Sequence, residues 1–297
     1  MYVLLGSNGN ITSKAARILL SHSRSVRVVG RSAERLAALK QAGADLAIGD
    51  ATDTNFLASA FKGATAVFAM LPPVYSAPDM RAEQNRLGEA IAQAIAKSGV
   101  TKVVNLSSSG AHLSEGTGPV VALHLQEQRL NALEGVDVLH LRPGYFFENH
   151  FSAIDTIKTA GVYADRISSK APIATVGTGD IAIVVARELA AFKTTGKQVL
   201  HLRAPKFYTQ AEAAAILGKA IGNAELKHVQ ADPAQAKAGM VQFGFSPDVA
   251  DQFEEMSRSL SVGNTVDAVI AGPTEITPTT LEQFAASIFA PAFLASA

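Results

Sequence analysis

Short apolar runs alternate with longer amphipathic segments through the first half of the chain. Residues 2–5 (YVLL) are apolar and stop at Gly6, which is typical of a buried strand, and residues 13–22 carry apolar positions at helical spacing. Further strands are expected at 26–30, 45–49, 65–71, 101–106 and 136–142, and further helices at 32–42, 79–98 and 120–134. Strands that alternate with helices predict βαβ units and a parallel sheet.

The predicted sheet is doubly wound, with right-handed crossovers. Sheets of this kind bind ligands outside the carboxyl ends of their strands, so the residues that directly follow each strand are the ones to inspect for function. They are residues 6–12, Arg31, Asp50, residues 70–73, residues 107–109 and residues 143–147.

The second half of the chain has a less regular pattern. A strand is expected at 199–203, and Thr209 with Glu212 fits a capping box for a helix over 210–221. Further elements are expected at 225–230 (strand), 233–260 (helix, interrupted near residue 246) and 279–289 (helix). This half is therefore expected to form a smaller lobe that folds over the sheet.

Composition narrows the class of protein. Lys+Arg and Asp+Glu both number 26, and this balance argues against a nucleic-acid-binding protein and against a polybasic membrane anchor. The chain has no cysteine, which excludes disulfides and thiolate chemistry. No apolar run reaches the roughly 18 residues of a membrane span, and the start of the chain lacks the basic region of a signal peptide. We expect a soluble, cytoplasmic protein.

The segment G-S-N-G-N-I-T at residues 6–12 is a candidate phosphate-binding turn. It follows a strand and precedes a helix, where backbone N–H groups can hold a pyrophosphate. The strict G-x-G-x-x-G pattern fails, because its second and third glycines would be Asn8 and Ile11. The wider spacing keeps Gly6 and Gly9 and places Thr12 at the third position. A plain strand-to-helix turn remains the alternative.

The end of the second strand bears on which dinucleotide would bind. NAD-binding units place Asp or Glu there for the ribose hydroxyls, whereas this chain has Arg31. A guanidinium can bind a 2′-phosphate, so the sequence favours NADP(H), with NAD(H) as the second option. Asp50 is a candidate acceptor for the adenine amino group. A solvated surface arginine and a turn aspartate are the respective alternatives.

Several segments resemble the NmrA-like group of atypical short-chain dehydrogenases/reductases. They are G-S-N-G at 6–9, V-G-R at 29–31, G-D-A-T-D at 49–53, L-R-P-G-Y-F-F-E-N at 141–149, G-T-G-D-I-A at 177–182 and T-T-L-E-Q-F at 279–284. The resemblance covers about residues 1–290. It implies a Rossmann-type doubly wound parallel sheet with a smaller α/β C-terminal substrate lobe. The NAD(P)-binding domain would span 1–150, with its sheet completed from 180–203, and the mostly helical substrate lobe would span 151–297.

The same resemblance implies where the cofactor lies. The residues expected to line the pyrophosphate are Gly6, Asn8, Gly9, Asn10 and Ile11. Arg31 would meet the 2′-phosphate, and Asp50 with Ala51 would meet the adenine. The residues expected near the ribose and nicotinamide are Met70, Leu71, Pro72, Ser107, Ser108 and Tyr145.

The chain departs from ordinary short-chain dehydrogenases at the proton-transfer residues. None of its five tyrosines is followed by Lys four positions later, so the usual Tyr-x-x-x-Lys pair is absent. In isoflavone-type reductases a Lys lies in the helix before the sixth strand, and this position corresponds to His124. Histidine is a suitable proton donor near neutral pH. We expect His124 and Tyr145 to be catalytic, with a half-buried structural histidine as the alternative.

Aromatic residues are candidates for a flat apolar substrate pocket. They are Tyr145, Phe146, Phe147, Phe151, Phe243 and Phe245. Core packing is the alternative for at least half of them. The histidines show no H-E-x-x-H spacing, and no nucleophile elbow or P-loop is present, so no metal site is expected.

These observations favour an NAD(P)H-dependent oxidoreductase, NADPH-preferring, that transfers hydride to a quinone, enone, dye or similar conjugated acceptor. The hydride chemistry would belong to the nicotinamide. The alternative is a non-catalytic NADP(H) sensor that acts through a protein partner. The expected partner is a small conjugated or aromatic molecule, with no nucleic acid or membrane, and a homodimer is left open.

Overall fold

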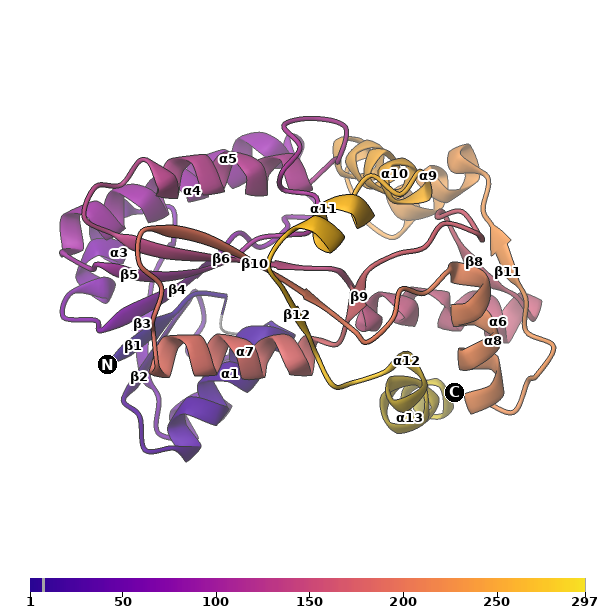
Figure 1. Ribbon diagram of the computed structural model, residues 1–297, viewed down its shortest axis with the longest axis horizontal. Coiled ribbons are helices and arrows are strands. Elements are labelled where there is room, and N and C mark those ends of the chain that lie inside the picture. Colours follow the sequence, from indigo (N-terminus) through magenta and orange to yellow (C-terminus); the bar gives the residue numbers. More distant parts are fainter. Residues whose placement is uncertain (7–8, 297) are drawn as a thin grey trace.

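The computed structural model describes residues 1–6 and 9–296, and this part of the chain contains an eight-stranded sheet (Figure 1). The strand order is β12-β10-β6-β5-β4-β1-β2-β3, and every neighbouring pair is parallel. The strands are β1 Tyr2–Leu4, β2 Val26–Gly30, β3 Asp45–Ile48, β4 Ala66–Met70, β5 Lys102–Leu106, β6 Asp137–Pro143, β10 Lys197–Arg203 and β12 Thr274–Ile276. The order reverses at β1, between β2 and β4, so the predicted doubly wound sheet is confirmed.

Helices cover both faces of the sheet (Figure 1). Helices α1 and α7 lie on one face, and α3, α4 and α5 lie on the other. The helices of this part are α1 Asn10–Ser21, α2 Ala37–Gln41, α3 Thr54–Phe61, α4 Met80–Ser98, α5 Val120–Asn131 and α7 Thr178–Ala190. A parallel sheet covered on both faces explains the continuous apolar runs in its strands.

Strand β1 shows this double burial directly. Leu4 packs into the cluster beneath α1 and α7, whereas Val3 and Leu5 pack into the cluster beneath α3, α4 and α5. Successive side chains of a strand point to opposite faces, so both faces of β1 must be apolar. Burying each such side chain fully contributes about 1.5–3 kcal/mol to stability.

The second lobe lies beyond the carboxyl ends of the strands (Figure 1). Its elements are β7 Tyr145–Phe146, η1 Phe147–Ala153, α6 Ile154–Ala160, β8 Tyr163–Asp165, β9 Thr175–Val176, α8 Gln210–Ala220, β11 His228–Gln230, α9 Pro233–Gln242, α10 Pro247–Ser261, α11 Val266–Ala271, α12 Leu281–Phe284, the π-helical η2 Ala285–Phe289 and α13 Ala290–Ala295. The capping box predicted for Thr209 and Glu212 is present at the start of α8. The interruption predicted near residue 246 is also confirmed, because Ser246 caps α10.

Two close approaches join the lobe to the sheet domain. Gly118, in the loop before α5, has a φ of 57°, and a Cβ there would lie 1.9 Å from the carbonyl oxygen of Gln252 in α10. Only glycine allows this contact. The second contact joins η1 to α7. The carboxylate of Glu148 accepts the backbone N–H of Thr178, the first residue of α7, at 3.1 Å and so caps this helix.

Helix α2 and strand β12 differ from the prediction. Helix α2 begins at Ala37, because turns occupy residues 33–36 of the predicted helix. Strand β12 was not expected at all, and it pairs with β10 at the edge of the sheet. Both β10 and β12 follow residue 150, so the C-terminal half of the chain contributes two strands to the sheet. The division into a domain over 1–150 and a lobe over 151–297 stays a prediction.

Candidate functional site

The loop after β1 is shaped by a glycine at a crowded position. Gly6 has a φ of 72°, and a Cβ there would lie 1.9 Å from the Sδ atom of Met70 at the end of β4. The N–H of Gly9 donates to the carbonyl of Gly6 at 2.9 Å and closes the turn. Gly9 is the N-cap of α1, and no side chain of the described residues caps that first turn. The geometry suits a phosphate group, which binds such helix N-termini.

The other residues predicted to line the pyrophosphate differ in their exposure. Asn10 is exposed in the first turn of α1, whereas Ile11 is buried in the core beneath the helix. Asn8 lies outside the described residues. The hydroxyl of Thr12, at the position of the missing third glycine, donates to the carbonyl of Leu5 at 3.0 Å. Thr12 therefore ties α1 to the end of β1.

Arg31 and Asp50 follow neighbouring strands of the sheet. Arg31 is exposed directly after β2, and Asp50 is exposed after β3. The Asp50 carboxylate accepts the backbone N–H of Thr52 at 2.9 Å, so it does form a turn, with Ala51 half-buried inside it. This hydrogen bond, together with the charges of Arg86 and Arg31, lowers the pKa of Asp50.

The loop after β4 connects the expected nicotinamide position to the second lobe. Met70 is half-buried, Leu71 is buried and Pro72 is exposed. Farther along the loop, the carbonyl of Tyr75 accepts the N–H of Ser246 at 2.9 Å.

The same loop makes an aromatic contact with that lobe. The ring of Tyr75 lies 4.9 Å from that of Phe245 and 6.1 Å from that of Phe253. We call Tyr75, Phe245 and Phe253 the aromatic trio. Tyr75 remains 47% exposed, so one of these rings is accessible to a ligand.

The end of β5 contains a buried ionic group that sequence analysis missed. The hydroxyl of Ser107 donates to the carboxylate of Glu127 in α5 at 2.5 Å. Arg142 of β6 binds the same carboxylate through Nε at 2.9 Å and Nη2 at 2.5 Å. The Ser107 hydroxyl proton is thus directed at Glu127, and the neighbouring Ser108 is half-buried. No pattern in the sequence marks this pair, because its members are brought together only by helix-on-sheet packing.

The two residues predicted to be catalytic have different surroundings. His124 is half-buried on α5, and its Nδ1 lies 2.9 Å from the carbonyl of Ala111, to which it must donate. Tyr145 is half-buried after β6, and its ring packs among apolar side chains that include Ile167 and Leu260. Burial, and then the negative charge of Asp165, raises the pKa of Tyr145. Its phenol therefore stays protonated at neutral pH.

The aromatic residues proposed for the substrate pocket divide into three groups. Phe147 and Phe151 pack against Phe284 in the core of the second lobe, so the core alternative holds for them. Phe243 is 80% exposed at the end of α9. Phe245 belongs to the aromatic trio, in which Tyr75 lies on the loop after β4, Phe245 lies just before α10 and Phe253 lies in α10.

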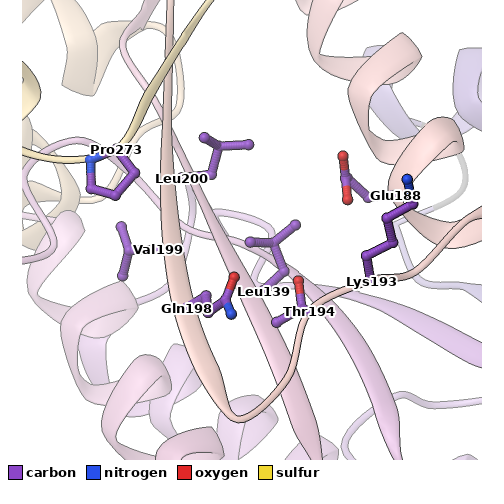
Figure 2. Close-up of a pocket in the computed structure, with 8 residues that line it drawn as sticks. All are labelled: Leu139, Glu188, Lys193, Thr194, Gln198, Val199, Leu200 and Pro273. Carbon is purple, nitrogen blue, oxygen red and sulfur yellow. The ribbon is translucent and has the colours of Figure 1, made fainter.

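A groove of about 500 Å³ is lined by none of these aromatic residues, and Figure 2 shows the side chains that do line it. It runs along the amino-terminal halves of β6 and β10, where Leu139, Gln198 and Leu200 line it. Of its charged residues, Glu188 already pairs with Arg187 at 2.8 Å. The groove is therefore separate from the carboxyl edge that the sequence singles out.

Two further features are absent from the described residues. No helix among them is long and apolar enough to cross a membrane. No three His, Asp or Glu side chains in that part of the chain come close enough together to hold a metal ion.

A doubly wound parallel sheet with a tight glycine turn that leads into an uncapped helix defines a dinucleotide-binding protein of the Rossmann type. The family model described as NAD(P)H-binding matches residues 6–206. The chain belongs to this NAD(P)H-binding family. The predicted family relationship and the predicted NAD(P)H cofactor are thereby confirmed.

Three named proteins resemble the chain at 25% identity or less. The NAD(P)H azoreductase of Xenophilus azovorans is 25% identical over 264 residues, which cover 86% of each chain. The NADPH-dependent quinone oxidoreductase of Escherichia coli, solved with NADPH, is 20% identical with a TM-score of 0.77 over 97% of this chain and 100% of that one. The triphenylmethane reductase of Citrobacter sp., solved with NADP(H), is 18% identical with a TM-score of 0.78 over 96% and 99%. These likenesses establish the fold.

Proposed function

We propose that the protein is an NADPH-dependent reductase that transfers hydride to a quinone, enone, dye or similar conjugated acceptor. The aromatic trio carries this proposal, because its exposed ring, Tyr75, lies on the loop that begins at Met70, Leu71 and Pro72. Planar conjugated molecules bind such surfaces by stacking. The names of the azo, quinone and triphenylmethane reductases agree with this substrate class.

The cofactor would be held along the carboxyl edge of the sheet. Gly6, Gly9, Asn10 and Ile11, together with Asn8, would surround the pyrophosphate. Arg31 would bind the 2′-phosphate, which favours NADPH over NADH. The residues proposed to contact the adenine, ribose and nicotinamide are Asp50, Ala51, Met70, Leu71, Pro72, Ser107, Ser108 and Tyr145. When bound, NADPH supplies the hydride.

The proton chemistry would fall to Tyr145 and His124. Tyr145 carries a phenol that stays protonated, so it can donate to the oxygen or nitrogen that becomes anionic in the acceptor. His124 holds the loop after β5 through Ala111 and keeps its Nε2 free for a ligand or water. This pair would replace the Tyr-x-x-x-Lys arrangement that the chain lacks.

The test is a titration of the purified protein with NADPH and NADH, followed by absorbance at the nicotinamide band with a quinone, an enone and an azo dye. We expect tighter binding of NADPH and its consumption with at least one acceptor. Absence of binding would overturn the assignment of the cofactor residues. Binding without consumption would overturn the reductase proposal and favour the NADP(H) sensor.

A further inference from the structure

Four ionisable side chains of the second lobe form a connected chain of polar contacts. The Nδ1 of His150 lies 2.6 Å from the hydroxyl of Tyr163, and that hydroxyl lies 3.4 Å from Oδ2 of Asp165. The other oxygen of Asp165 lies 3.0 Å from Nε2 of His228. The chain connects η1, which packs against β8, with the strands β8 and β11, and these two strands lie at the end of the molecule remote from the sheet (Figure 1).

Both ends of this chain are buried, because the side chain of His228 is 1% exposed, and solvent reaches it only at Asp165, in its middle. His150 and Tyr163 are each 1% exposed, whereas the Asp165 side chain is 11% exposed. Two further polar side chains, Ser169 and Gln210, contact this chain. Ser169 lies 2.7 Å from Nδ1 of His228, and Gln210 lies 3.5 Å from the Tyr163 hydroxyl.

One ring nitrogen of His150 takes no part in this chain of contacts. The Nε2 atom of His150 has no hydrogen-bond partner among the described residues, although it is fully buried. Buried polar groups almost always have a partner, and one without a partner needs an explanation. The His150 ring packs edge-on against the ring of Tyr145, with 5.9 Å between the ring centres. The spare nitrogen therefore belongs to a side chain in contact with the proposed proton donor.

The tautomers of His150 allow a proton to pass without a buried charge. Burial lowers the pKa of His150 to about 4, so the imidazole is neutral at neutral pH. A neutral imidazole carries one proton, on either nitrogen. When the Tyr163 hydroxyl donates to Nδ1, the proton of His150 sits on Nε2, the nitrogen that has no hydrogen-bond partner among the described residues.

We propose that His150, Tyr163, Asp165 and His228 form a proton relay that resupplies Tyr145 after each reduction, and this inference rests on the proposed function. The acceptor gains a hydride from the nicotinamide and a proton from the Tyr145 hydroxyl, which gives the hydroquinone from a quinone. The Tyr145 phenolate regains a proton from Nε2 of His150, directly or through one water. Nδ1 of His150 takes the proton of Tyr163, and Tyr163 is reprotonated by solvent through Asp165, whose other oxygen is held by His228. Reorientation of the His150 ring and of the Tyr163 hydroxyl then restores the starting arrangement, with an N–H again available to Tyr145. One hydride and one proton are consumed in each cycle.

The test variant is Tyr163→Phe, which removes one oxygen and keeps the buried ring. The matched control is Tyr208→Phe. Tyr208 is a buried tyrosine of the same lobe whose hydroxyl donates to Glu282 at 3.0 Å and lies outside the relay. Both variants lose one buried hydroxyl, so a purely structural effect should lower the turnover of both variants to a similar extent.

Two acceptors separate proton supply from hydride transfer. A quinone needs a hydride and a proton, whereas a cationic triarylmethane dye becomes neutral by gaining a hydride alone. We expect Tyr163→Phe to lower quinone turnover at least tenfold while dye turnover and the Kd for NADPH stay unchanged, and Tyr208→Phe to spare both acceptors. Equal losses with quinone and dye, or equal losses in the two variants, would overturn the relay.

A second measurement decides the matter if the dye is not a substrate. Because proton supply then limits the rate, quinone turnover of Tyr163→Phe is expected to slow in D₂O more than that of the wild type or of Tyr208→Phe. Equal solvent isotope effects in Tyr163→Phe and Tyr208→Phe would overturn the relay. Failure of the wild type to consume NADPH with any acceptor would instead overturn the proposed function.

Discussion

The hydroxyl of Ser107 points into the protein, toward the carboxylate of Glu127, at 2.5 Å. The carboxylate is also bound by Arg142, and the side chains of Glu127 and Arg142 are only 4% and 13% exposed. A buried ion pair becomes costly when one partner loses its charge, because the other charge is left uncompensated. The pair therefore fixes the end of β5 beside the expected nicotinamide position.

Glu127→Gln should destabilise the protein by about 3–5 kcal/mol, because it leaves the Arg142 guanidinium without its counter-charge. Urea denaturation measures this loss. The matched control is Glu275→Gln, which alters the more exposed pair of Arg187 with Glu275 and should cost about 0–1 kcal/mol. Similar losses in the two variants would show that the Glu127 pair has no special role.

Arg31→Ala should weaken NADPH binding about 10- to 100-fold and leave NADH binding nearly unchanged. A hydrogen bond between charged groups contributes about 1.5–3 kcal/mol, and only NADPH carries the 2′-phosphate. Calorimetric titration with each nucleotide measures the difference. Arg27→Ala serves as the control, because Arg27 of the same strand pairs with Asp45 at 2.8 Å. Equal losses for NADPH and NADH would contradict the assignment of Arg31.

His124→Ala should lower turnover about 100-fold, which is within the usual range for a proton-transferring group, and change NADPH affinity little. Steady-state kinetics with direct titration separates the two effects. His124→Asn keeps an N–H near the Nδ1 position for the carbonyl of Ala111 but cannot transfer a proton. If His124→Asn is as active as the wild type, His124 anchors the loop and takes no part in the chemistry.

Much of the fold could be predicted because the central strands are buried on both faces. The run YVLL at 2–5 has to be apolar throughout, and its end at Gly6 places the turn correctly. Strand β12 gives no such signal. It has three residues at the edge of the sheet, and Ile276 is 55% exposed there. Its place depends on pairing with β10, which no local pattern encodes.

The same contrast applies to the candidate site, where some residues have a local sequence signal and others have none. Gly6 and Arg31 could be proposed from the sequence because they directly follow strands, and strand ends gather at one edge of a parallel sheet. The contacts of Glu127, and that of His150 with Tyr163, were missed. Their polar partners lie 15 to 20 residues away for Glu127 and 13 for His150, on other elements. Such groups become visible only when packing distances are known.

Acid should destabilise the protein through its buried histidines, of which His140 is the clearest. Its Nδ1 lies 3.1 Å from the amide nitrogen of Asn105, and its Nε2 lies 3.0 Å from the amide oxygen of Asn131. This arrangement suits a neutral ring that accepts at Nδ1 and donates at Nε2. Burial lowers the pKa of His140 from 6.5 to about 4, with the charges of Arg142 and Lys197 adding to it and that of Glu127 opposing it.

The sign of the effect follows from these two pKa values. Below pH 6.5 His140 is protonated in the unfolded chain. In the folded protein it becomes protonated only near pH 4, because its pKa is lowered to about 4. Stability is therefore complete above pH 6.5 and falls as the pH drops toward 4, by roughly 2 kcal/mol at pH 5 for this one group. His140→Gln keeps one donor and one acceptor but does not titrate. Urea denaturation at pH 7 and pH 5 should show a smaller difference for this variant than for the wild type, and an unchanged difference would place the acid sensitivity elsewhere.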